Sequence, residues 1–173
     1  TSHSLVVQLA GAAALTERVR LWTTLIILPA HDPVQVAKDM ASVDRLSGGR
    51  LTLGVGVGGR EQDYRAVGAD FSRRWSRMDD QVERMRGIWN QEPPFEGSDP
   101  VGPPPLQPGG PPFAAGVMGP KAIARAARWA FGVNDPSSIT DVDADALGAQ
   151  RQKVLEAWQT AGRREPPPFS TTL

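Results

Sequence analysis

The sequence predicts an α/β fold in which parallel strands alternate with helices. Stretches with apolar residues at helical spacing alternate along the chain with short strand-like runs, which indicates about five strands. Strands that are joined through helices run parallel, with right-handed crossovers. The chain has 173 residues, enough for one well-buried domain, so we treat residues 1–173 as a single domain. An all-parallel sheet with helices outside it is either an open doubly wound sheet or a barrel.

The first third of the chain follows this alternation. Residues 5–15 are predicted to form a helix and residues 19–28 a strand, which ends at Pro29 because proline cannot donate to a strand ladder. Asp32-Pro33 opens the next helix in the preferred order of a capping residue before proline. Gly48-Gly49 ends that helix, as glycine does just past a helix end.

The strand over residues 50–57 has an unusual pattern. Its bulky residues alternate with Thr52, Gly54 and Gly56, so one face of the strand is nearly bare. A bare face leaves room for something other than side chains to approach the backbone. We therefore expect a close approach, from a ligand or from backbone, over these glycines.

The rest of the chain continues the alternation around one irregular segment. The expected elements are helices over 60–68 and 73–89, a strand over 113–117, a helix from Pro120, a strand over 131–134, a helix from Asp143 to Gly162 and a terminal strand from Phe169. Residues 93–112 hold nine prolines and four glycines, which excludes regular structure. A loop of this length is functional or mobile, and we expect that it could serve as a lid.

Composition narrows the classes of partner. The chain has 19 basic and 19 acidic residues, so nothing suggests binding to nucleic acid. It has no cysteine and two histidines, which disfavours disulfides, thiol catalysis and a metal site. The apolar run over residues 5–15 is shorter than the ~20 residues that cross a bilayer and has no basic leader. We expect a cytoplasmic protein without a membrane partner.

Five blocks of residues, in order, resemble motifs of the luciferase-like monooxygenase superfamily. The most complete match is Asp44–Gly59 (DRLSGGRLTLGVGVGG), and the other four are Thr16–Leu21, Leu28–Lys38, Tyr64–Trp89 and Pro111–Arg128. No block is specific alone, but five in sequence are. The resemblance implies a TIM-barrel type (β/α)8 fold. The first two barrel strands and the last have no counterpart, so we expect an incomplete barrel and, from its open sheet edges, a homo-oligomer.

The resemblance also implies a flavin-type cofactor, FMN or the deazaflavin coenzyme F420, and a small-molecule substrate. Carried over by position, Thr24-Leu25 would be the bulged step after the third barrel strand that packs against the cofactor ring, and Gly58 and Gly59 would form the loop after the fourth strand. The loop that cradles the cofactor phosphate would contain Gly116, Val117 and Gly119, next to the cationic Lys121. Taken alone, each of these glycines is equally well explained by a tight turn.

The sequence does not identify a catalytic residue. A loop histidine such as His31 is more often solvated than catalytic, and Trp75 and Trp89 fall on the apolar stripe of a helix, as core residues do. In flavin enzymes the cofactor carries the redox chemistry, and the protein orients the reactants. The resemblance implies a monooxygenase or oxidoreductase.

Two other functions stay open. The chain could be a shortened, non-catalytic flavin-binding or assembly protein. Alternatively, Gly54, Gly56 and Gly59 fit the nicotinamide-binding pattern G-x-G-x-x-G, with Asp79 near the distance for a ribose contact. The strand continues through its glycines, whereas in a Rossmann unit the glycines follow a finished strand, so this pattern is disfavoured.

Overall fold

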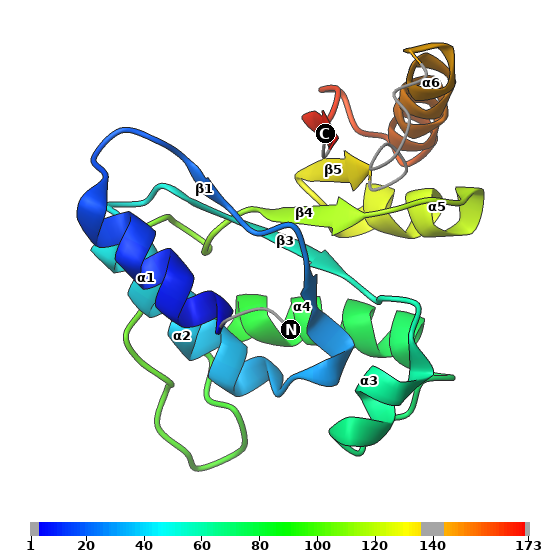
Figure 1. Cartoon of the computed structure of the whole chain (residues 1–173). Coiled ribbons are helices and arrows are strands. Elements are labelled where there is room, and N and C mark those ends of the chain that lie inside the picture. The colour runs from blue at the N-terminus through cyan, green and yellow to red at the C-terminus, as the bar shows by residue number, and fades with distance from the viewer. Residues whose placement is uncertain (1–3, 136–143, 172–173) are drawn as a thin grey trace.

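The computed structural model describes residues 4–135 and 144–171 and contains one curled parallel sheet (Figure 1). Its six strands are β1 (Leu21–Trp22), β2 (Ile26–Ile27), β3 (Leu51–Gly56), β4 (Phe113–Gly116), β5 (Gly132–Asp135) and β6 (Phe169–Thr171). The order is β1-β3-β4-β5-β6, with β2 also paired to β3, and every pair is parallel. This is the incomplete (β/α)8 barrel that the resemblance implies.

Helices cover the outside of the sheet. They are α1 (Leu5–Leu15), the short 3-10 helix η1 (Leu28–Ala30), α2 (Pro33–Leu46), α3 (Glu61–Ala66), α4 (Arg74–Trp89), α5 (Pro120–Trp129) and α6 (Ala144–Thr160). The capping prediction for α2 is confirmed, because the Asp32 carboxylate accepts from the amides of Val34 and Gln35, both at 2.9 Å. The predicted cap Asp143 lies outside the described residues.

The predicted strand over residues 19–28 is interrupted in the structure. β1 and β2 pair with the two halves of β3, in the registers Leu21 with Leu51 and Ile26 with Val55. Between them the backbone turns in toward Gly54, where the Thr23 hydroxyl donates to the Gly54 carbonyl at 2.8 Å. A Cβ on Gly54 would lie 1.9 Å from the Thr23 carbonyl oxygen. At this glycine, backbone makes the close approach that the bare strand predicts.

Two apolar clusters hold the helices to the sheet. The first packs α1, α2 and α4 against β1 to β4, and the second packs α5 and α6 against β4 and β5. Trp89 is a core residue, as predicted: it stacks on Phe113 with ring centroids 5.3 Å apart, and its indole donates to the Ala37 carbonyl at 3.0 Å. Among the described helices none combines the length and the apolar character that crossing a membrane requires.

The proline- and glycine-rich loop lies at the amino ends of the strands, on the side opposite α3 (Figure 1). The fully buried Asp44 carboxylate holds it, accepting from the amides of Leu106 (2.8 Å) and Gln107 (2.9 Å) and from the Gln107 side chain (2.7 Å). The loop leads into the first residue of β4, so it cannot cover the carboxyl ends. The lid interpretation of residues 93–112 is therefore wrong.

Candidate functional site

A cavity of about 780 Å³ opens at the carboxyl ends of β3 and β4. Barrel enzymes place their sites at this end of the strands. The predicted residues that line the cavity are Leu25, Gly58, Gly59, Gly116 and Gly119. We call this space the glycine cavity. Three segments far apart in the sequence therefore meet here.

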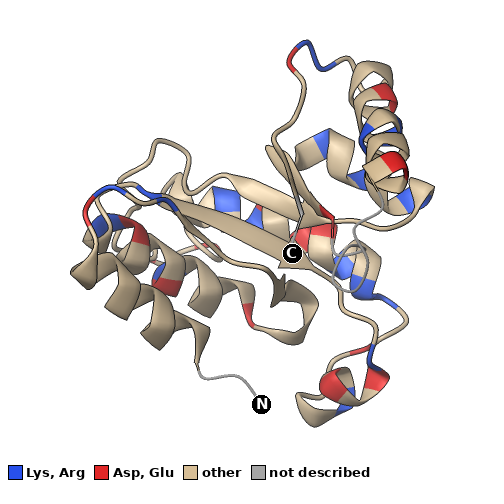
Figure 2. Ribbon diagram, turned by 45° about the horizontal axis from the view of Figure 1, so that its top comes forward, with Lys and Arg blue, Asp and Glu red and all other residues tan. Residues whose placement is uncertain are grey.

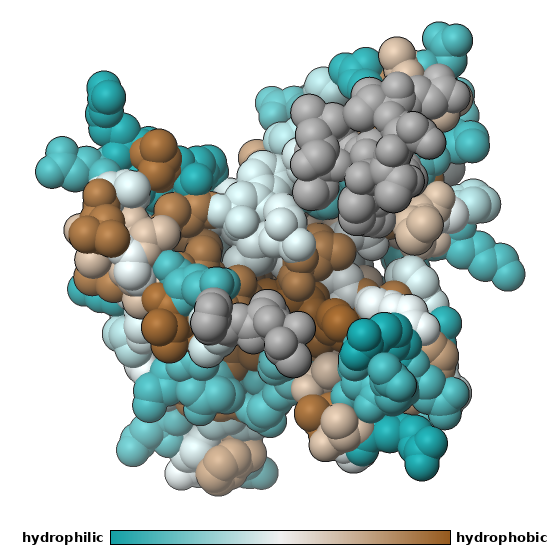
Figure 3. Space-filling view, in the orientation of Figure 1, coloured by the Kyte–Doolittle hydropathy of each residue, from teal (hydrophilic) through white to brown (hydrophobic). Residues whose placement is uncertain are grey.

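Leu25 covers the floor of the glycine cavity. A Cβ on Gly56 would lie 2.8 Å from Leu25 Cδ1, and one on Gly116 would lie 2.3 Å from the same atom. The two strand glycines therefore make room for one leucine side chain. Leu25 also lines a second, larger cavity of about 1080 Å³, bounded by α1, β1, β2 and α2. Figure 3 shows apolar side chains gathered in the hollow between α1 and α3.

Two of the predicted residues do not line the glycine cavity. Thr24 is exposed and faces the second cavity instead. The peptide between Thr24 and Leu25 is cis. Val117 is buried, and its amide donates to the Asn134 carbonyl at 3.2 Å. Its backbone N–H is therefore already used in holding the loop to β5.

The turn from β4 into α5 forms one wall of the cavity. Gly119 is the N-cap of α5 and Pro120 its first residue, and no side chain caps the helix. The first amides of a helix have no partner within the helix, and the helix end carries a partial positive charge. A Cβ on Gly119 would meet nothing within 4 Å, so the space beside this helix end is open. Lys121 and Arg125 line the same wall. This combination suits an anionic group.

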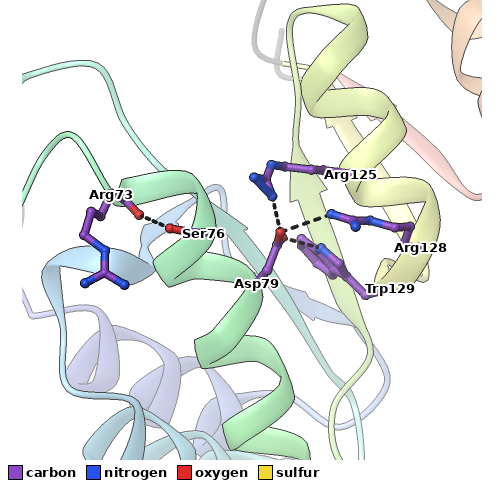
Figure 4. A network of polar contacts seen from close by, with 6 residues as sticks. All are labelled: Arg73, Ser76, Asp79, Arg125, Arg128 and Trp129. Atoms are coloured by element: carbon purple, nitrogen blue, oxygen red, sulfur yellow. Dashed lines mark hydrogen bonds and ion pairs between the residues drawn. The ribbon is translucent and has the colours of Figure 1, made fainter.

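Arg125 is held by Asp79, which joins α4 to α5 (Figure 4). The Asp79 carboxylate also accepts from Trp129 Nε1 at 3.0 Å and pairs with Arg128 at 3.2 Å. In the same view, Ser76 donates to the carbonyl of Arg73 within α4 at 3.1 Å. Asp79, the residue proposed for a ribose contact in the nicotinamide pattern, is thus engaged between two helices. Gly54 and Gly56 of that pattern lie within β3 and do not follow it. Both observations argue against the nicotinamide pattern.

Several residues that line the cavity were not assigned to the cofactor site, and two of them, Trp75 and Arg125, carry large side chains. Trp75 packs against both apolar clusters, as the core prediction expects, and it also lines the glycine cavity from the first turn of α4. Arg125 was not singled out. Arg125 could have been found from the sequence, because it lies four residues after Lys121, and residues four apart lie on one face of a helix.

Tyr64 is a titratable residue near the cavity that has a structural role. Tyr64 is fully buried, and its hydroxyl donates to the Val57 carbonyl at 2.5 Å, which fastens α3 beneath the loop at Gly58. Burial raises the pKa of Tyr64, and the positive charges of Arg74 and Arg77 partly oppose this. His31 is exposed and lines the second cavity. Among the described residues, no histidine or carboxylate lines the glycine cavity.

Comparisons with known proteins agree with this geometry. The monooxygenase RslO1 from Streptomyces bottropensis is 28% identical, with a TM-score of 0.77 over 95% of this chain and 53% of its own. A Pseudomonas putida structure, the oxygenating constituent of 3,6-diketocamphane monooxygenase in complex with FMN, shares the fold at 19% identity, with a TM-score of 0.78 over 96% of this chain and 51% of its own. A putative coenzyme F420-dependent oxidoreductase of Mycobacterium tuberculosis is 35% identical over 92 residues, which is 53% of this chain and 26% of that protein.

The matches cover only part of the relatives. Among curated relatives the matched share of their length is 30% for one mycobacterial protein and 54% for another. A family model described as luciferase-like monooxygenase matches residues 1–173. This chain belongs to the luciferase-like monooxygenase family.

Proposed function

We propose that this chain supplies the cofactor-binding half of a flavin- or deazaflavin-dependent oxidoreductase, with FMN or F420 bound in the glycine cavity. One observation carries the proposal: a floor made by Leu25 with glycines around it, and a helix start without a side-chain cap among the described residues, meet in a single cavity beside Lys121 and Arg125. Its volume of about 780 Å³ falls within the range of roughly 300–1,000 Å³ that small-molecule and cofactor sites occupy.

The residues present fit such a cofactor. Leu25, with Gly58 and Gly59 beyond it, offers an apolar and nearly side-chain-free surface for a flat ring. Gly119 leaves the entrance to α5 open, where the phosphate would meet backbone amides and Lys121. Within this proposal Val117 fixes the loop through its own hydrogen bond, and Thr24 lines the second cavity next to Leu25.

The bound cofactor would supply hydride or oxygen chemistry toward a small organic substrate. The chain's own residues would bind and orient the cofactor, and Asp79 would keep Arg125 at the rim of the cavity. The relative in complex with FMN and the putative F420-dependent relative support both cofactors.

A second candidate function is binding without catalysis. It is favoured by the absence, among the described residues, of any histidine or carboxylate that lines the glycine cavity. In that case the chain would hold a flavin but depend on another segment or subunit for proton transfer. Turnover measured after binding has been established separates the two functions.

The test of binding is a fluorescence titration of the purified chain with FMN and, separately, with F420. We expect saturable binding of one of them, weakened about tenfold or more by Gly119→Val, because the new side chain enters open space at the helix start. Gly148→Val is the matched control, since Gly148 is an exposed residue of α6 with nothing within 4 Å. Binding of neither cofactor by folded protein, or equal affinity in the Gly119 variant, would overturn the proposal.

We also infer that the chain self-associates. Within the described strands, β1 and β6 form the two ends of the sheet order. Unpaired strand edges favour pairing with another chain. Sedimentation velocity at increasing concentration should show a dimer or larger species, and a monomer at all concentrations would contradict this inference.

A further inference from the structure

A small cavity of about 220 Å³ lies at the other end of the strands from the glycine cavity. It is bounded by Phe113, the first residue of β4, and by the end of α5. Arg86 of α4 and Arg163, which follows α6, both line it. Within residues 4–135 and 144–171, no acidic residue lines it. Two cations from distant parts of the sequence thus share one space without a carboxylate.

The contacts of these arginines account for only part of their charge. Arg86 Nη2 donates to the Trp129 carbonyl at 2.6 Å. Arg163 Nη1 donates to the carbonyls of Ala127 at 3.2 Å and Ala130 at 3.1 Å. All three carbonyls belong to the C-terminal end of α5, and a helix end offsets about half of one elementary charge. Two full positive charges meet there, one on the half-buried Arg86 and one on the exposed Arg163, and the helix end balances only part of them.

The surroundings leave this excess charge in place. Among the described residues neither Arg86 nor Arg163 makes an ion pair. Burial lowers the pKa of the half-buried Arg86, and the positive charge of Arg163 lowers it further, without an opposing carboxylate. Each guanidinium has five N–H donors, more than the bonds to α5 use. Phe113 and Trp129 add aromatic walls that cannot neutralise a cation fully.

We propose that this cavity is a binding site for a phosphate-sized oxyanion, held between the guanidinium groups of Arg86 and Arg163. Arginine suits oxyanions because its planar fork of donors matches their geometry. The bound anion would join α4, the end of α5 and the segment after α6. Its source is either free inorganic phosphate or the phosphate group of a small monoester. The site is independent of the proposed cofactor function.

Calorimetric titration with inorganic phosphate, at constant ionic strength set by sodium chloride, tests the proposal. We expect saturable binding that Arg86→Gln and Arg163→Gln each weaken about tenfold or more, because each removes charge-assisted hydrogen bonds. Arg164→Gln is the matched control next to Arg163, and it should bind like the wild type. Arg86→Lys keeps the charge if the glutamine variant fails to fold, and it should show intermediate affinity.

Two further arms locate the anion and its source. Lys121→Gln alters the glycine cavity alone, so phosphate binding should persist in it. Glycerol phosphate binding with the same arginine dependence would support a monoester source, and its failure alongside phosphate binding would support free phosphate. No saturable binding by folded wild-type protein would overturn the proposal. The proposal would also be overturned if Lys121→Gln abolished phosphate binding while Arg86→Gln and Arg163→Gln bound phosphate like the wild type.

Discussion

The close approach of Thr23 to Gly54 predicts a severe effect of the smallest possible side chain. In Gly54→Ala the new Cβ would lie 1.9 Å from the Thr23 carbonyl oxygen and 3.2 Å from Trp22 Nε1. The first contact is with backbone, which cannot rotate away as a side chain can. Thr23 is also fixed by two bonds, from its amide to the Thr52 carbonyl (3.3 Å) and from its hydroxyl to the Gly54 carbonyl (2.8 Å).

The size of the effect follows from these contacts. Moving Thr23 away breaks two hydrogen bonds, at about 1 kcal/mol each. Overpacking of the surrounding core adds about 1–3 kcal/mol. Alanine also stiffens the unfolded chain, which returns about 0.4–1 kcal/mol to stability. The expected net loss is therefore about 2–4 kcal/mol, a large part of the ~5–15 kcal/mol that holds a domain folded.

Urea unfolding followed by tryptophan fluorescence measures this loss. The control is Gly148→Ala, in which the same substitution on an exposed helix meets nothing within 4 Å and should stabilise by up to about 1 kcal/mol. A Gly54→Ala midpoint equal to that of the wild type, with an unchanged slope, would refute the placement of the Thr23 carbonyl. A lower midpoint in both variants would show that the effect is not specific to this contact.

Three other variants test the remaining framework. Arg50→Ala should lower the free energy of unfolding by about 2–4 kcal/mol in urea, because Arg50 donates to the carbonyls of Ala13, Thr16, Val19 and Ser47; unchanged stability would contradict this bracing role. Asp79→Asn should cost about 1–3 kcal/mol in thermal unfolding at low salt by unpairing Arg125 and Arg128, and a neutral result would argue against the link between α4 and α5. Burial raises the pKa of Tyr64, so its contribution to the free energy of unfolding is complete below the unfolded pKa of about 10 and is lost as pH rises through the folded value. Tyr64→Phe should therefore lose less stability between pH 9 and 11 than the wild type. Parallel curves of stability against pH would refute this.

The order of helices and strands could be predicted from the sequence because it depends on local patterns. The cap at Asp32 and the glycines that end α2 are short-range signals, and both are confirmed. The interruption beside Thr23 was implied by the resemblance alone, as a bulged step at Thr24-Leu25. The local pattern over residues 19–28 indicates one strand, and only the pairing with β3 reveals the turn inward. Trp75 fell on the apolar stripe of its helix, but the first turn of α4 extends to the cavity.

The interpretation of residues 93–112 failed for a topological reason. Composition indicates a loop but says nothing about which end of the sheet it covers. A loop that enters a parallel strand must lie at the amino end of that strand, so the position was available from the order of the elements. The roles of Thr24, Leu25 and the glycines in binding a cofactor stay predictions.

The glycine cavity and the second cavity lie next to each other. Figure 2 shows acidic and basic residues mixed on α3 and on α6. Between the two spaces, the shared wall includes the side chain of Leu25. An aliphatic side chain can change rotamer, whereas backbone cannot rotate in this way. A different Leu25 rotamer would therefore change the room in both spaces at once, and Leu25→Ala would remove the side chain that separates them.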